Sequence, residues 1–185
     1  EKLAKDAEVA EVIPDRLAFV QLTPNDPQFA NQWALSASQG VSAPGAWDLS
    51  TGDPNLVIAI LDTGRLNHAD LAGRWIAGYD FVADTNRSND TDGRDTDALD
   101  PGDWVTAAEA ASGPLAGCTE TNSRWHGTLM AGVIGATGNN AAGIAGVNWQ
   151  SKLLPVRVVG KCGGYTSDIV DGMRWAVGLA VPGVP

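Results

Sequence analysis

The sequence has no long apolar run and few basic residues. Its longest continuous apolar stretch, residues 56–61, is far shorter than the about 18 residues that a membrane helix needs. It contains 12 Lys and Arg against 22 Asp and Glu, which gives a formal net charge of −10. Binding to nucleic-acid phosphates requires clustered Lys and Arg. We therefore expect neither a membrane-spanning segment nor a nucleic-acid partner.

Cysteine and histidine are also scarce. The two cysteines, Cys118 and Cys162, are either free thiols or one disulfide. We predict the disulfide, because both stand in glycine-flanked, loop-like contexts where an exposed thiol would be a liability, and it implies an oxidising compartment. Its long loop would stabilise the fold by about 4 kcal/mol on the chain-entropy account. The two histidines, His68 and His126, do not have the spacing of metal ligands, which argues against a zinc site.

The apolar segments predict a parallel α/β sheet. Apolar residues make up 44% of the 185 residues, enough for one globular domain. Residues 56–61 are continuously apolar, which is typical of a strand buried on both faces. Asp62 follows at the carboxyl end of this strand, where functional residues of α/β sheets gather. A Pro/Asn/Asp cluster at residues 23–27 marks the clearest boundary and divides 1–22 from 23–185.

Two helices and a further strand are expected in the second half of the chain. Small and apolar residues after His126 predict a helix to about residue 136, and residues 152–159 predict a strand. Thr166 or Ser167 is expected to cap a last helix. The expected inner face of that helix is Ile169, Met173, Ala176 and Ala180.

Two motifs carry the chemistry: Asp-Thr-Gly at 62–64, after the apolar strand, and His-Gly-Thr at 126–128, opening the small-residue helix. In this order and spacing they resemble the subtilase family of serine proteases. Residues 68–71, 139–149 and 154–158 resemble the segments that surround these motifs in the family. The resemblance extends over residues 24–185. It implies an α/β, parallel-sheet, subtilisin-like three-layer fold, of which about the first half is expected here.

The resemblance also implies residue roles. His126 would be the general base of an Asp-His-Ser triad, and Asp62 would orient its imidazole. The family's Ser stands in Gly-Thr-Ser-x-Ala, which does not occur in this sequence. We expect a missing C-terminal half to supply that Ser and the oxyanion-hole Asn, so that this chain alone is inactive. Leu129 stands where the family usually has a second, structural His.

The implied parent protein is a secreted, extracellular endopeptidase that hydrolyses protein or peptide substrates. Residues 1–22 resemble the end of a subtilase propeptide, a helix and then a strand, which would be a folding aid and inhibitor; an ordinary N-terminal extension is the alternative. Asp-Thr-Gly also occurs in aspartic proteases, but Arg65 follows it here, no second copy exists and that fold is all-β. A non-catalytic pseudoprotease or calcium-binding scaffold is the remaining alternative.

An acidic segment is a candidate calcium site. Between Asp80 and Asp103 there are eight aspartates against two arginines. Closely spaced carboxylates suit a hard cation with oxygen ligands, although Leu99 replaces the Glu of an EF-hand loop. A solvated acidic loop is the alternative. The candidate ligands of a structural Ca²⁺ are Asp84, Asp90, Asp92, Asp95 and Asp97.

Overall fold

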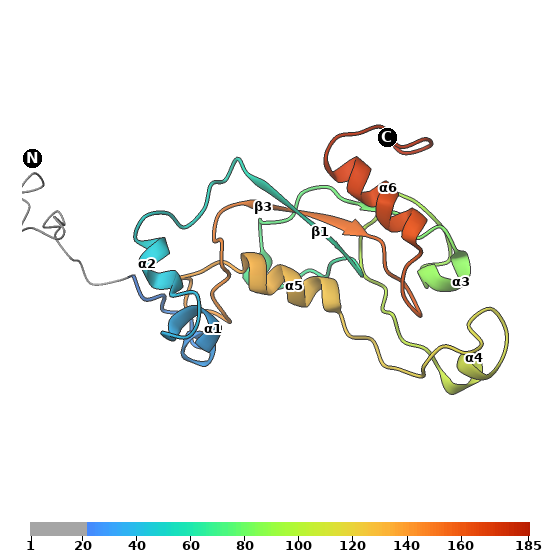
Figure 1. Cartoon of the computed structure of the whole chain (residues 1–185), viewed down its shortest axis with the longest axis horizontal. Coiled ribbons are helices and arrows are strands. Elements are labelled where there is room, and N and C mark those ends of the chain that lie inside the picture. The colour runs from blue at the N-terminus through green and yellow to red at the C-terminus, as the bar shows by residue number, and fades with distance from the viewer. Residues whose placement is uncertain (1–21) are drawn as a thin grey trace, which may run out of the picture.

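The computed structural model describes residues 22–185, so nearly all of the predicted propeptide segment, residues 1–22, lies outside the described residues. The described part is a layered α/β structure (Figure 1). Its helices are η2 (Phe29–Asn31), α1 (Trp33–Ser36), α2 (Ala43–Trp47), η3 (Ala69–Leu71), α3 (Thr85–Ser88), α4 (Ala107–Ala111), α5 (His126–Gly135) and α6 (Thr166–Ala176).

The sheet is parallel and has the strand order β1-β3-β2, formed by β1 (Val57–Asp62), β3 (Lys152–Arg157) and β2 (Tyr79–Asp80). Arg157 is the register partner of both Asp62 and Asp80. The carboxyl ends of the three strands therefore lie at one edge of the sheet. The predicted parallel α/β class is confirmed.

Helices α5 and α6 cover opposite faces of this sheet, as Figure 1 shows. Ile58 and Ile60 of β1 pack on the side of α5, while Ala59 and Leu61 pack on the side of α6. This alternation follows from the two-residue period of a strand. The three layers are thus α5, the sheet and α6, with an apolar core on each side. A third apolar cluster, around Trp47, lies among the N-terminal helices and the segment before β3.

The predicted burial of the first strand is wrong in detail. The strand at 56–61 was expected to be buried on both faces, but in β1 only Ile60 is fully buried and Val57 is 47% exposed. The reason is that β1 lies at the edge of the described sheet, whereas the central β3 is buried along nearly its whole length.

Within residues 22–185 no helix is long and apolar enough to cross a membrane.

The last helix departs from its predicted cap and face. Helix α6 begins at Thr166, but its N-cap is Tyr165, which makes no side-chain capping bond. Ile169 and Ala176 pack on the sheet as expected. Met173 is 54% exposed, and Ala180 lies beyond the end of the helix.

Candidate active site

Asp62 and His126 meet at the carboxyl edge of the sheet. Asp62 is the last residue of β1, and His126 is the first residue of α5. The imidazole Nδ1 lies 2.7 Å from Oδ2 and 2.9 Å from Oδ1 of the carboxylate. The Asp62 side chain is only 14% exposed, whereas that of His126 is 51% exposed. A shielded carboxylate therefore holds one edge of a ring whose remainder is accessible.

Glycines make this contact possible. A β-carbon on Gly127 would lie 2.1 Å from the carbonyl oxygen of Gly64, so only glycine allows α5 to approach the end of β1 this closely. Gly64 itself has φ +108°, a conformation that L side chains rarely adopt. Trp125, at φ 52°, turns the chain into α5. Gly127 thus permits the close approach of the two motifs, while Gly64 supplies the left-handed turn after Asp62 and packs against the backbone of residues 98–100.

The motif threonines join the same two elements. The hydroxyl of Thr63 accepts a hydrogen bond from the Gly127 N–H at 3.0 Å and donates one to Asp100 at 2.5 Å. The hydroxyl of Thr128 accepts from the Leu66 N–H at 2.8 Å. Asp100 was not predicted as a site residue. It is 5% exposed, and this burial raises the pKa of its carboxyl.

This arrangement suits proton transfer at the second ring nitrogen. An ionised carboxylate only accepts hydrogen bonds, so we assign the proton of neutral His126 to Nδ1, facing Asp62. Nε2 is then the basic nitrogen, on the exposed side of the ring. Among residues 22–185 no serine hydroxyl forms a hydrogen bond with His126. We call the pair of Asp62 and His126 the dyad.

The five calcium candidates are not gathered into one metal site. In the described part of the chain, no group of three or more His, Cys, Asp or Glu side chains is arranged to hold a metal ion. Asp84 caps α3, accepting from the Asn86 backbone at 3.0 Å. Asp90 forms an ion pair with the buried Arg157. An arginine and a helix N-terminus thus engage two of the five candidate carboxylates, and the calcium site stays a prediction.

The other three candidates share a surface hollow. Asp92, Asp95 and Asp97 line a hollow of about 390 Å³ together with Asp90 and Asp100. Asp95 accepts a hydrogen bond from the backbone of Asp97 at 2.7 Å, which bends the loop back on itself. Desolvation and the negative charges of Asp95 and Asp90 raise the pKa of Asp92. The hollow is acidic, but its carboxylates do not converge on one point.

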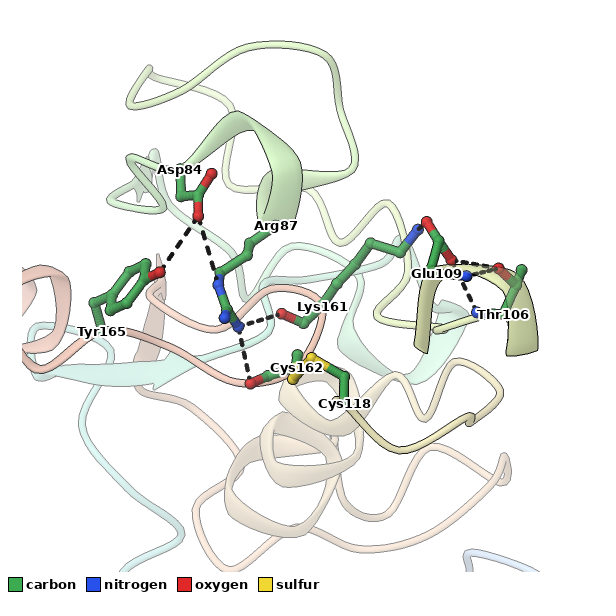
Figure 2. Close-up of a disulfide and its surroundings, with 8 residues drawn as sticks. All are labelled: Asp84, Arg87, Thr106, Glu109, Cys118, Lys161, Cys162 and Tyr165. Carbon is green, nitrogen blue, oxygen red and sulfur yellow. Dashed lines mark hydrogen bonds and ion pairs between the residues drawn. A yellow bond between two sulfur atoms is a disulfide. The ribbon is translucent and has the colours of Figure 1, made fainter. Parts of the chain in front are cut away.

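Cys118 and Cys162 form the predicted disulfide, with 5.7 Å between their Cα atoms. Figure 2 shows that it joins the loop after α4 to the loop between β3 and α6. Lys161, next to Cys162, forms an ion pair of 2.6 Å with Glu109 of α4. Arg87 Nη1 donates to the carbonyl oxygens of Lys161 and Cys162, both at 3.1 Å. Helix α4 and the segment that leads from it toward His126 are thus attached to the loop between β3 and α6 by an ion pair and a covalent bond.

Comparison with known proteins identifies the family. The model of the Subtilase family matches residues 53–182, which include both motifs. The chain belongs to the subtilase family. It is 44% identical over 185 residues to an extracellular protease of Xanthomonas campestris pv. campestris, covering 100% of this chain and 31% of that protein. It is 42% identical over 183 residues to an extracellular basic protease of Dichelobacter nodosus, covering 99% and 30%.

A solved subtilase-like structure matches the fold. The structure of proteases from Pseudoalteromonas arctica PAMC 21717 superposes with a TM-score of 0.81 at 48% identity, over 89% of this chain and 47% of that one. The predicted subtilisin-like fold is therefore confirmed. The chain spans about a third of the length of the two curated subtilase relatives.

Proposed function

We propose that the protein to which this chain belongs is a secreted serine endopeptidase, with Asp62 and His126 as two members of its catalytic triad. The observation that carries the proposal is the contact of 2.7 Å between His126 Nδ1 and the shielded Asp62 carboxylate. The printed names of the two relatives, both extracellular proteases, support a secreted enzyme that acts on proteins or peptides.

In the proposed reaction, His126 Nε2 takes the proton of a serine hydroxyl as that oxygen attacks the scissile carbonyl carbon. The leaving amine then receives this proton, and water repeats the sequence to hydrolyse the acyl-enzyme. Asp62 keeps the ring in the Nδ1-protonated tautomer and stabilises the imidazolium that forms. The nucleophilic Ser and the oxyanion-hole Asn would come from sequence outside these 185 residues. This division is supported by the length of the relatives, of which this chain covers only 31% and 30%.

We further propose that residues 1–22 are the end of a propeptide, which assists the folding of its own protease and inhibits it. The alignment with the extracellular protease of Xanthomonas campestris runs over all 185 residues, so this segment has a counterpart in that protein. Self-cleavage near residues 20–24 would separate it from 23–185. N-terminal sequencing of the purified active enzyme tests this, and an active enzyme that retains residues 1–22 would contradict it.

We also propose a structural calcium ion at the hollow lined by Asp92, Asp95 and Asp97, where a cation would offset the repulsion between carboxylates. The fit is partial, because these carboxylates would have to turn toward one another. Thermal unfolding with Ca²⁺ and after chelation tests it. We expect a higher Tm with Ca²⁺, and no such increase in the Asp95→Asn/Asp97→Asn variant; an equal Tm with and without Ca²⁺ in the native protein would contradict the site.

Peptidase assays of the full-length protein test the main proposal. We expect cleavage of a peptide substrate, a loss of about 10⁶-fold in kcat for His126→Ala and about 10⁴-fold for Asp62→Asn. His68→Ala is the matched control, because the hydrogen bond that the His68 side chain makes within residues 22–185 is the cap of η3. Full activity in His126→Ala would overturn the triad assignment. Activity of the 185-residue chain alone would overturn the external nucleophile, and a folded full-length protein without activity would favour a pseudoprotease.

A further inference from the structure

A buried carboxylate outside the dyad is unused by the proposed reaction. Asp100 is 5% exposed and lies on the loop that pairs with the residues after Asp62. Its Oδ1 accepts from the Gly102 N–H at 2.8 Å, and its Oδ2 accepts from the Thr63 hydroxyl at 2.5 Å. Both oxygens thus face donors, one of which belongs to the catalytic motif.

The direction of these hydrogen bonds is fixed by chemistry. The Gly127 N–H can only donate, so the Thr63 oxygen must accept it. Thr63 has a single hydroxyl proton, and that proton must then point to a different acceptor. The Asp100 carboxylate is that acceptor. The two hydrogen bonds therefore form a relay in which Gly127 donates to Thr63 and Thr63 donates to Asp100, and neither bond can be reversed.

These hydrogen bonds connect the residues that directly follow Asp62 and His126 in the sequence. Thr63 directly follows Asp62, and Gly127 directly follows His126. Thr63 is 2% exposed and Gly127 is buried, so water has little access to replace these bonds. Catalytic rates are sensitive to displacements of about 1 Å between reacting groups. A change in the hydroxyl orientation of Thr63 would therefore be transmitted to the contact between His126 and Asp62.

We propose that Asp100 is a positioning residue for the dyad: by accepting the Thr63 proton, it orients the hydroxyl that anchors the first turn of α5 to the end of β1. The kinetic consequence rests on the proposed peptidase function, whereas the structural consequence does not. Burial raises the pKa of the Asp100 carboxyl, and the negative charge of Asp103 acts in the same direction, whereas the positive charge of Arg157 favours the ionised form. The hydrogen bonds from Thr63 and Gly102 also favour the carboxylate that the relay requires.

Isosteric variants of the full-length protein test the relay. Asp100→Asn keeps the shape but turns one of the two acceptors into an NH₂ group, which then faces a donor. Thr63→Val removes the hydroxyl, and Thr63→Ser keeps it. We expect Asp100→Asn and Thr63→Val each to lower kcat about 10- to 100-fold with little change in KM. The double variant should be no worse than the more impaired single variant, and Thr63→Ser should recover most of the activity.

Asp103→Asn is the matched control. Asp103 is 2% exposed and belongs to the same loop, but it accepts from the Arg124 backbone at 2.8 Å and from the Arg124 guanidinium. It makes no bond to Thr63 within residues 22–185. Its effect should multiply with that of Thr63→Val. Multiplicative losses for Asp100→Asn and Thr63→Val would overturn the proposal.

Amide exchange of Gly127 gives a readout that does not depend on catalysis. In the full-length protein, Asp100→Asn should accelerate exchange of this amide at least about 10-fold relative to Asp103→Asn, because the acceptor of its hydrogen bond is no longer oriented. An unchanged Gly127 amide would overturn the proposal. Inactive native protein with accelerated Gly127 exchange in Asp100→Asn would refute the peptidase function and leave the structural role of Asp100 supported.

Discussion

Gly127 and Gly64 are in backbone contact where α5 meets the end of β1, with 2.1 Å between the carbonyl oxygen of Gly64 and the place of a β-carbon on Gly127. Neither side of this contact can yield easily, because both are backbone. Gly127→Ala should therefore push His126 away from Asp62. We predict a loss of activity of about 100-fold or more and a lower Tm, measured by peptidase assay and thermal unfolding of the full-length protein.

Gly132→Ala is the control on the same helix. A β-carbon there would meet only the Ile144 Cδ1 atom, at 3.7 Å, which is an ordinary van der Waals contact. Alanine has a higher helix propensity than glycine, so this variant should be as active as the wild type and more stable by up to about 1 kcal/mol. Equal damage from both substitutions would show that close approach at Gly127 is not the cause.

The disulfide gives a second prediction. Cys118 and Cys162, drawn in Figure 2, form a disulfide across 44 positions of sequence, and the loop that it closes contains α5. The Cys118→Ser/Cys162→Ser variant should lose about 2–4 kcal/mol of unfolding free energy, because its unfolded chain is less constrained. Denaturant titration measures this loss. A reductant should lower the stability of the native protein to that of the variant and leave the variant unchanged; a reductant-sensitive variant would contradict the assignment.

The pairing of Asp62 and His126 was predictable because each residue stands in a local motif and the two motifs together, in this order, resemble the subtilase family. Asp62 ends an apolar strand and His126 opens a small-residue helix, and neither signal requires knowledge of distant contacts. Asp100 carries no such mark, since it is one aspartate among eight and its partner Thr63 is 37 positions away. Its role depends on burial, which an acidic loop does not suggest from sequence.

Tertiary context also explains where the structure differs from the sequence-based expectations. Asp90 is a predicted calcium ligand, and the structure places the guanidinium of Arg157, which is 67 positions away in sequence, beside its carboxylate. Likewise, an apolar run predicts a strand without giving its place in the sheet, so the sequence did not show that β1 lies at the edge of the sheet formed by residues 22–185. In both cases the sequence does not show which distant segment of the chain packs beside the residue or strand in question.

The buried ion cluster at Arg157 gives a third prediction. This side chain is 1% exposed and pairs with Asp80, which is fully buried, and with the partly exposed Asp90. Burial raises the pKa of Asp80 to about 7 even with Arg157 beside it. Arg157→Leu should cost about 3–5 kcal/mol of unfolding free energy, because it leaves the buried Asp80 carboxyl without its ion-pair partner and forces it to take up a proton. Denaturant titration measures the loss. Adding Asp80→Leu to Arg157→Leu should restore part of it, and a double variant worse than the single one would contradict this explanation.

The ion pair between Lys161 and Glu109 gives a fourth prediction, on how the stability of the protein depends on pH. The hydrogen bond from Lys161, aided by the N–H and hydroxyl of Thr106, lowers the pKa of Glu109 from 4.5 to about 2 (Figure 2). A carboxyl whose pKa is lower in the folded state stabilises the fold fully above its unfolded pKa, and loses this effect as the pH falls through the folded value. The Tm difference between the wild type and Glu109→Gln should thus be largest above pH 4.5 and shrink toward pH 2.

Thermal unfolding between pH 2 and 7 measures this difference. Glu120→Gln is the control, because Glu120 is an exposed glutamate without an ion pair in residues 22–185. A Tm difference that stays constant over this range, or one that Glu120→Gln reproduces, would show that the ion pair does not hold α4 against the loop of Cys162.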